Sequence, residues 1–515
     1  MSNKDAIVTT KNGKLEGEQK NELYVFKGIP YAEPPVGKLR WKPPQPAKKW
    51  SGARPAKKFG AVAPQPTMPG GTAIGTPSFA GQEQSEDCLS LNIWTPGLDD
   101  AKRPVLLWIH GGAFYIGSGT EAFLEEGVLA RRGNVVVVSI NYRLGAFGFL
   151  NLNEVTGGKI PATGNEGILD QIASLEWLQE NIAAFGGDPN NITASGFSAG
   201  AMSVGTLLGM PLAKGKFHKA MNRSGAANVV NPLENAVKIA ELQLKIWGLT
   251  SKDTDGINAL TTGNILEGQN RLIAQMRESE GRGTPYQPVK DGKYIPEMPI
   301  TAIKKGSAKN VPTMAGCTLD ELKMMQAMDP NAAKMDEAGL VKKLEAMVPK
   351  EMIKDLIPTY KTALTKRGCK STPAEILGSI NTDSFFRIPT IRMVEAQRDN
   401  GTPAYNYLFV HKCPAMGGVM GAMHGLDNPF LFGALVPEFT GKDEELERTA
   451  TQIQDTAIAF MKTGDPSCKS VGKWPVYGKD RMTMVWDRKS HLEAAPYEQE
   501  RAVWDKYDFS YSKPL

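Results

Sequence analysis

The sequence has no long apolar run. No stretch of about eighteen consecutive apolar residues occurs in the 515 residues, so we predict no membrane-spanning helix. The first residues, Met-Ser-Asn-Lys-Asp, also lack the apolar stretch of a secretory signal. We therefore expect the protein to reside in the cytoplasm.

Cysteine is scarce, and its number is odd. The spacing never forms a C-x-x-C pair, which argues against a zinc site and against a complete disulfide framework. We expect free thiols in a reducing compartment and no bound metal. A disulfide between Cys369 and either Cys413 or Cys468 is the alternative. The five cysteines are Cys88, Cys317, Cys369, Cys413 and Cys468.

The sequence also lacks a strong excess of charge. Its 60 Lys and Arg residues against 55 Asp and Glu residues leave a net charge of +5, and the basic residues are scattered. This pattern argues against a nucleic-acid partner. The content of 41% hydrophobic and 22% charged residues is typical of an ordinary globular protein, and the chain has no internal repeats.

Apolar strands alternate with helices after the first sixty residues, which are predicted to form short strands and Pro-rich turns. The continuous apolar runs 105–109 and 135–140 suit strands buried on both faces of a mostly parallel sheet. Apolar residues recur at helical spacing over 167–181, and 191–195 follows as a short strand. This order predicts an α/β fold with a large central sheet.

Two further segments, at about 233–282 and 331–400, have a helical pattern and are rich in Lys, Glu and Met. We expect them to form a lid or a side subdomain around the sheet.

A Gly-Phe-Ser-Ala-Gly segment at 196–200 follows the short strand and precedes a helix. In this strand–turn–helix context, G-x-S-x-G is the nucleophile elbow of a serine hydrolase. The turn is too tight for bulky flanking side chains, and Gly196 and Gly200 meet that need. We therefore predict that Ser198 is the nucleophile.

Backbone donors for an oxyanion are predicted in the segment His-Gly-Gly-Ala-Phe at 110–114, which follows the first apolar strand directly. Acyl transfer needs N–H groups aimed at the tetrahedral oxygen, each worth about 3 kcal/mol of barrier. Glycine lets the backbone approach closely. Gly111, Gly112 and Ala199 are the predicted donors.

The base is sought among only five histidines. His424 lies in a glycine-flanked loop C-terminal to Ser198, as the order serine, acid, histidine requires in this fold. His411, at the end of an apolar strand over 405–410, is the alternative. The other histidines are assigned to loop or structural positions: His110, His218 and His491.

The acid is expected between Ser198 and His424. A strand-like segment at 311–316 is followed by Asp320 and Glu321, and a carboxylate at a strand end is well placed to orient an imidazole. Position does not decide between these two residues, and Asp383 is a further candidate.

These motifs together resemble the type-B carboxylesterase family, which includes bacterial para-nitrobenzyl esterases and the cholinesterases. The resemblance covers nearly the whole length. It implies an α/β-hydrolase fold in a single catalytic domain over 1–515, a small-molecule ester substrate and no cofactor. It also implies that Glu321 is the acid and His424 the base. The segments that carry it are 26–37, 85–94, 110–114, 141–145, 164–167, 185–189 and 196–200.

The sequence departs from the family pattern at three places. Phe197 stands where the family usually has Glu, Leu322 stands where Gly often follows the Asp-Glu pair, and the loop 68–84 contains no Trp. The missing Trp removes the cation–π platform that choline-binding relatives use. We therefore expect the substrates to be neutral, apolar or anionic esters rather than choline esters. The alternative for Phe197 is that it only packs under the helix and does not affect the substrate preference.

A substrate pocket is predicted from Phe197, Phe114 and Met423, with Met416 and Met420 close to His424 in the sequence. Methionine is adaptable enough to line an acyl or alcohol pocket or to fill gaps in a core. An amidase or carbamate hydrolase with the same triad is the nearest alternative to an esterase. A binding-only protein of the same fold would lack the nucleophile or the base, and here both are present.

Overall fold

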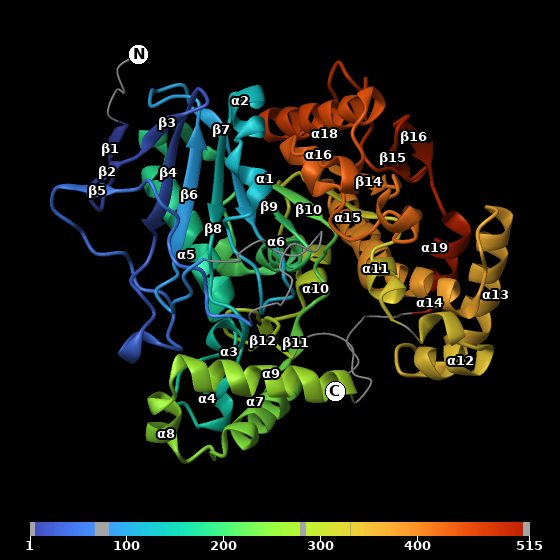
Figure 1. The fold of residues 1–515 in the computed structure, drawn as a ribbon, viewed down its shortest axis with the longest axis horizontal. Coiled ribbons are helices and arrows are strands. Elements are labelled where there is room, and N and C mark those ends of the chain that lie inside the picture. The colour runs from blue at the N-terminus through green and yellow to red at the C-terminus, as the bar shows by residue number, and fades with distance from the viewer. Residues whose placement is uncertain (1–5, 67–81, 279–284, 330, 508–515) are drawn as a thin grey trace.

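An eleven-stranded mixed sheet forms the centre of the protein in the computed structural model (Figure 1). The structure describes residues 6–66, 82–278, 285–329 and 331–507. From one edge to the other, the strand order is β16-β15-β14-β13-β10-β9-β7-β8-β6-β4-β3. In chain order these strands are β3 (Glu18–Lys20), β4 (Leu23–Pro30), β6 (Ser90–Thr95), β7 (Arg103–Ile109), β8 (Val136–Ile140), β9 (Gly187–Phe197), β10 (Lys219–Arg223), β13 (Thr313–Thr318), β14 (Ala404–Phe409), β15 (Met482–Trp486) and β16 (His491–Ala494).

The neighbouring strands from β15 to β8 all run parallel, and antiparallel strands occur only at the two edges of this sheet. The predicted apolar strands are β7 and β8, which pair with each other and are almost completely buried. The predicted α/β fold with a large, mostly parallel sheet is therefore confirmed. The short strands expected near the N-terminus are also present, as β1 (Ile7–Thr9), β2 (Lys14–Glu16) and β5 (Ala53–Pro55).

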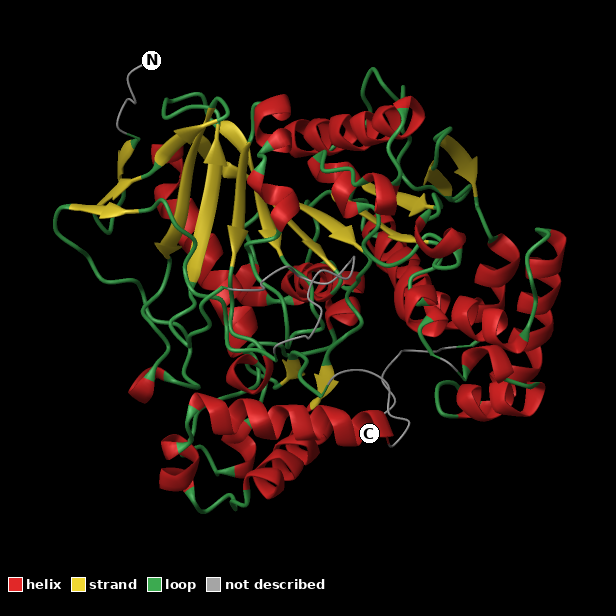
Figure 2. Ribbon diagram, viewed as in Figure 1, coloured by secondary structure: helices red, strands yellow, loops and turns green. Residues whose placement is uncertain are grey.

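Two hydrophobic cores cover the two faces of the sheet. Along β7, Val105, Leu107 and Ile109 belong to one core, whereas Leu106 and Trp108 belong to the other. This division follows from the alternation of side chains along a strand, and it explains why the strand is apolar at consecutive positions. Figure 2 shows the helices that cover both faces of the sheet.

The helices follow the predicted layout. The segment predicted over 167–181 is α5 (Glu166–Asn181), and α6 (Ala199–Gly209) begins directly after Ser198. The other helices are α1 (Ala122–Glu125), α2 (Val128–Gly133), α3 (Gly145–Gly148), α4 (Leu152–Val155), α7 (Leu233–Trp247), α8 (Thr254–Ala259), α9 (Thr262–Glu278), α10 (Pro299–Lys304), α11 (Lys323–Ala327), α12 (Glu337–Glu345), α13 (Lys350–Lys366), α14 (Pro373–Thr382), α15 (Ile388–Asp399), α16 (Asn428–Phe432), α17 (Pro437–Thr440), α18 (Glu444–Thr463) and α19 (Glu498–Asp505).

The described parts of the two segments with a helical pattern form separate helix groups, but the last helix of the second segment, α15, packs against β13 and β14 of the sheet. Helices α7 and α9 pack together, next to the short parallel pair β11 (Asn231–Pro232) and β12 (Val289–Lys290) (Figure 1). Helices α12, α13 and α14 pack with α19 around a third hydrophobic cluster of their own. A π-helical turn, Asp383–Arg387, joins α14 to α15.

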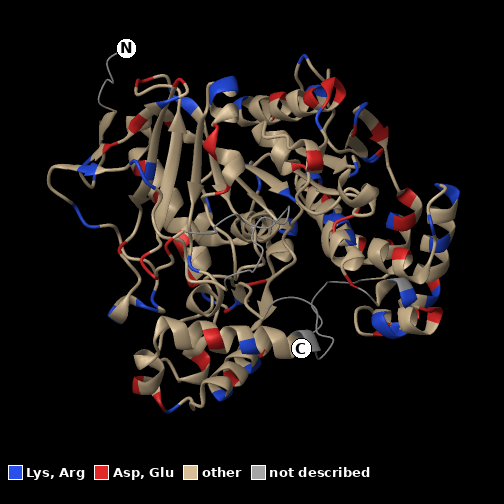
Figure 3. Cartoon of the chain, viewed as in Figure 1, with Lys and Arg blue, Asp and Glu red and all other residues tan. Residues whose placement is uncertain are grey.

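Cysteine chemistry and charge follow the sequence expectations. All five cysteines lie in the described ranges and are free thiols, so the alternative disulfides of Cys369 do not form in this structure. Acidic and basic residues are interspersed along the described chain (Figure 3). In the part of the chain that the structure describes, no helix is long and apolar enough to cross a membrane. Most of the Trp-free loop predicted over 68–84 lies outside the described residues.

Candidate active site

The turn that carries the predicted nucleophile, Ser198, joins the end of β9 to the start of α6. Ser198 has φ 55° and ψ −123°, a conformation that residues other than glycine rarely adopt. A Cβ atom on Gly200 would lie 1.9 Å from the carbonyl oxygen of Ile109, and one on Gly196 would lie 2.4 Å from the carbonyl carbon of Gly200. Both glycines are thus required by backbone packing, as the motif predicts.

The Gly-Gly loop lies directly beside this turn. A Cβ atom on Gly111 would lie 3.0 Å from the Cβ atom of Ser198, and Gly112 has φ +107°. Ala199 is the first residue of α6, where backbone N–H groups have no partner within the helix. Gly111 and Ala199 therefore lie next to Ser198, and Gly112 lines the same cavity.

His110 stabilises the Gly-Gly loop through contacts of its ring and its backbone. Its ring stacks on Tyr142 with centroids 4.5 Å apart, and Nδ1 lies 2.7 Å from the carbonyl oxygen of Gly111. Tyr142 in turn donates a hydrogen bond to the carbonyl oxygen of His110. Burial lowers the pKa of His110 to about 4, although the contact with Gly111 raises it, so the ring stays neutral.

The structure brings the predicted base and acid together. Nδ1 of His424 is in hydrogen-bond contact with Oε2 of Glu321. Glu321 is buried just after β13, and its Oε1 accepts a 2.7 Å hydrogen bond from the N–H of Thr318. Because Nδ1 faces Glu321, Nε2 is the ring nitrogen left for a reacting group.

Two aromatic rings flank His424. The ring of Phe197, which precedes the nucleophile, lies 4.5 Å from the imidazole, and the ring of Phe386 lies 5.0 Å from it. Phe386 comes from the π-helical turn Asp383–Arg387. The position of the imidazole is therefore fixed by packing as well as by Glu321.

The alternative site residues have other partners. His411 is buried, with Nε2 2.8 Å from the carbonyl oxygen of Thr440. Asp320 accepts a 2.9 Å hydrogen bond from the N–H of Ala422. Asp383 forms a buried ion pair with Arg387 and lies in the π-helical turn. None of these three candidates occupies the position beside His424 that Glu321 has.

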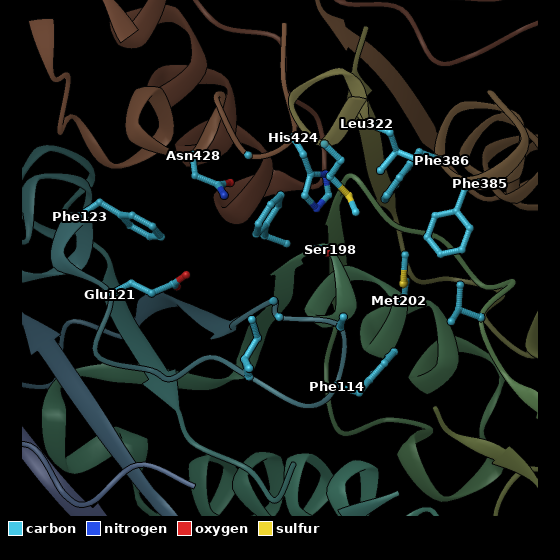
Figure 4. A pocket seen from close by; sticks show the side chains of 18 of the residues that line it. Phe114, Glu121, Phe123, Ser198, Met202, Leu322, Phe385, Phe386, His424 and Asn428 are labelled. Atoms are coloured by element: carbon cyan, nitrogen blue, oxygen red, sulfur yellow. The ribbon is translucent and has the colours of Figure 1, made fainter. Parts of the chain in front are cut away.

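A cavity of about 410 Å³ opens beside Ser198 and His424 (Figure 4). Its volume is in the range of small-molecule sites, and its lining is largely apolar. Of the three predicted pocket residues, Phe197 and Phe114 line this cavity, together with Gly111 and Gly112 of the Gly-Gly loop. Met423 does not line this cavity, because its side chain is completely buried in the core around β7 and β14.

Sequence reasoning missed several of the residues that line the cavity. Met202 and Met325 line the cavity, rather than the methionines next to His424 in the sequence. Met416 is exposed and Met420 is buried away from it. The other missed residues include Glu121, Phe123, Val229, Phe385 and Phe386. They come from helices and loops far apart in the sequence, and no motif marks them.

Leu322 also lines the cavity. Its φ of −106° needs no glycine, so the departure from the family pattern at this position does not strain the turn that carries Glu321. Within the described ranges, no group of three or more His, Cys, Asp or Glu residues is arranged to hold a metal ion.

Comparison with known proteins connects this geometry to a family. The sequence model of the carboxylesterase family matches residues 4–504. The chain belongs to the carboxylesterase family. It is 35% identical over 506 residues to the para-nitrobenzyl esterase of Bacillus subtilis (strain 168), covering 96% of this chain and 97% of that protein. It is 33% identical to the phenmedipham hydrolase of Pseudarthrobacter oxydans, covering 92% and 93% of the two chains.

Solved structures of carboxylesterases have the same fold. The crystal structure of the Geobacillus stearothermophilus carboxylesterase EST55 matches with a TM-score of 0.85 at 36% identity, over 97% of this chain and all of that chain. A para-nitrobenzyl esterase structure matches with a TM-score of 0.85 at 34% identity, over 96% and 99% of the two chains. The protein is therefore a carboxylesterase, an ester-cleaving serine hydrolase of the α/β-hydrolase fold, as its motifs predict.

The close packing at the nucleophile turn can be tested with two matched glycine substitutions. Gly200→Ala would force its Cβ atom against the backbone of β7. We therefore expect the free energy of unfolding to fall by about 1–3 kcal/mol. We also expect kcat/KM to fall at least tenfold, which is roughly the effect of a slightly displaced nucleophile. The measurements are thermal unfolding and hydrolysis of para-nitrophenyl acetate.

Gly263→Ala, in α9, is the control. The nearest atom to its added Cβ, Oγ1 of Thr261, lies 3.8 Å away. The free energy of unfolding should therefore rise by up to about 1 kcal/mol, because alanine favours the helix more than glycine does, and the activity should not change. Wild-type activity and stability in Gly200→Ala would contradict the packing argument.

Proposed function

We propose that this carboxylesterase cleaves esters in two steps through an acyl-enzyme on Ser198. His424 takes the proton of the Ser198 hydroxyl through Nε2, and the hydroxyl oxygen attacks the ester carbonyl carbon. The alcohol leaves with the proton that His424 returns. Water, activated by the same imidazole, then releases the acid and restores Ser198.

Glu321 and the backbone donors stabilise charge during both steps. Glu321 orients the imidazole and stabilises the imidazolium that forms when Ser198 loses its proton. The N–H groups of Gly111, Gly112 and Ala199 stabilise the oxyanion of each tetrahedral intermediate. The contact between His424 and Glu321 at the cavity that Ser198 lines is the observation that carries this proposal.

The apolar lining of the cavity supports a preference for neutral or apolar esters over choline esters. Phe197 takes the place of a carboxylate next to the nucleophile and presents its ring to the cavity. No Lys or Arg occurs among the described residues that line the cavity, so none of them offers a positive charge to an anionic substrate group. We therefore narrow the proposed class to neutral, largely apolar esters.

We further propose that the chain acts as one catalytic domain with the helical segments 233–282 and 331–400 at its side. The second segment supports a lid role, since Phe385 and Phe386 within it line the cavity. The five free thiols favour a reducing compartment, which is consistent with a cytoplasmic location.

The nucleophile is tested by Ser198→Ala on para-nitrophenyl esters from acetate to decanoate. We expect kcat to fall by roughly four orders of magnitude or more. Wild-type kcat/KM should rise by about fourfold per added methylene until the apolar cavity is filled, because each buried methylene contributes about 0.8 kcal/mol. Ser203→Ala, on the same helix but outside the cavity, should retain activity. A Ser198→Ala variant with wild-type rates would refute the proposal.

The acid is tested by comparing Glu321→Gln with Asp320→Asn. Glu321→Gln keeps the shape but removes the charge that holds the imidazole, so we expect kcat/KM to fall by about a thousandfold or more. Asp320→Asn still accepts the hydrogen bond from Ala422 and should change the rate by less than about tenfold. Larger losses in Asp320→Asn than in Glu321→Gln would assign the acid to Asp320.

The role of Phe197 is tested by Phe197→Glu, with Phe197→Leu as the uncharged control. A carboxylate beside the nucleophile should raise kcat/KM for a cationic ester relative to an isosteric neutral ester by about tenfold, because the charges attract in a poorly solvated cavity. Phe197→Leu should leave this ratio unchanged. An unchanged ratio in Phe197→Glu would show that Phe197 only packs under the helix.

A further inference from the structure

One carboxyl group in the cavity wall has no part in the proposed triad. Glu121 precedes α1, its residue is 8% exposed, and it lines the cavity. Its Oε2 accepts a 2.6 Å hydrogen bond from the indole N–H of Trp108. Among the described residues, Oε1 has no hydrogen-bond partner. Figure 4 shows the Glu121 carboxyl group pointing into the cavity.

The surroundings of Glu121 disfavour a negative charge. Phe123, Phe197 and Phe439 line the same cavity, and no Lys or Arg does so among the described residues. A buried carboxylate without a cationic partner is costly in such surroundings. Burial accordingly raises the pKa of Glu121 to about 8, although the hydrogen bond from Trp108 lowers it. Near neutral pH the side chain is therefore mostly an uncharged acid.

An uncharged Glu121 offers a hydrogen-bond donor to the cavity. The Trp108 N–H occupies Oε2 as an acceptor, which leaves Oε1 to carry the acid proton. Apart from Ser198 and His424, the polar side chains among the described residues that line the cavity are those of Glu121, Asn428 and Gln287. In Figure 4, Glu121 and Phe123 lie on one side of Ser198, whereas Phe385, Phe386 and Met202 lie on the other. The amide of Asn428 lies on the Glu121 side, and because its Oδ1 accepts a hydrogen bond from the guanidinium of Arg223, its Nδ2 would add a second donor there.

We propose that Glu121 is a specificity-determining residue that hydrogen-bonds an uncharged oxygen-bearing substituent of the ester, such as a hydroxyl or an amide, away from the scissile bond. The inference rests on the proposed function, because it takes Ser198 as the reacting residue. The substrate class becomes an ester with an apolar part and one uncharged polar group. The apolar part faces the wall that contains Phe385 and Phe386.

The experiment measures kcat/KM for matched esters that end in a methyl, a hydroxyl or a trimethylammonium group. One series carries this end group on the acyl chain and a second carries it on the alcohol, so that the two series identify which part of the ester reaches Glu121. We expect the wild type to prefer the hydroxyl over the methyl ester by about three- to tenfold in one series, the size of a single uncharged hydrogen bond.

Four variants separate the possible causes. Glu121→Gln keeps a donor and an acceptor and should retain the hydroxyl preference. Glu121→Met and Glu121→Leu are two apolar replacements, and both should lose the hydroxyl preference. Either variant is sufficient if the other fails to fold. Glu125→Leu, on α1 with its side chain 39% exposed, is the control and should behave as the wild type.

Two results would overturn the inference. The first is an unchanged hydroxyl-to-methyl ratio in a folded Glu121→Met or Glu121→Leu variant, in both series. The second is a wild-type preference for the trimethylammonium ester that Glu121→Gln abolishes, which would mean that a carboxylate binds a cation. In either case hydrolysis of the methyl ester continues. Failure of the proposed function itself is distinct, since hydrolysis of the methyl ester would then survive Ser198→Ala.

Discussion

Backbone contact between the Ser198 turn and β7 is the constraint on which the candidate active site depends. Gly200 packs so closely against the carbonyl oxygen of Ile109 that no side chain fits between them. Strands β7 and β9 pair in parallel with Ile109 opposite Gly196, so both strands end at the same level. The Gly-Gly loop, which follows β7, and Ser198, which follows β9, therefore lie next to each other.

The same edge of the sheet supplies the remaining parts. Strands β13 and β14 run parallel to β9 and β10, and the loops that carry Glu321 and His424 follow their carboxyl ends. Parallel strands present their carboxyl ends at one edge, where α/β proteins commonly bind ligands. Residues more than two hundred positions apart in the sequence, such as Ser198 and His424, thus line one cavity.

The side chains packed against the imidazole of His424 are mostly aromatic rather than polar. Phe197 and Phe386 flank His424, and only Glu321 makes a hydrogen-bond contact with its Nδ1 among the described residues. The buried carboxyl group of Glu121 contrasts with this packing, because it puts a polar group into a largely apolar wall. The proposed selection among esters therefore depends on shape and hydrogen bonding rather than on charge.

The sequence by itself determined the fold class, the family, and the residues that local geometry requires. Gly196, Gly200 and the Gly-Gly loop were predictable because tight turns and close backbone approach admit no other residue. The apolar strands were predictable because burial on both faces leaves no polar position.

Local sequence patterns did not distinguish Glu321 from Asp320 and Asp383. The family resemblance implied Glu321, and the tertiary structure shows that, of the three carboxylates, Glu321 is the one in contact with His424. It also replaced Met423 with Met202 and Met325 in the cavity wall, and it placed Glu121 there. A cavity is lined by side chains from separate elements, and their meeting depends on how those elements pack rather than on any one segment.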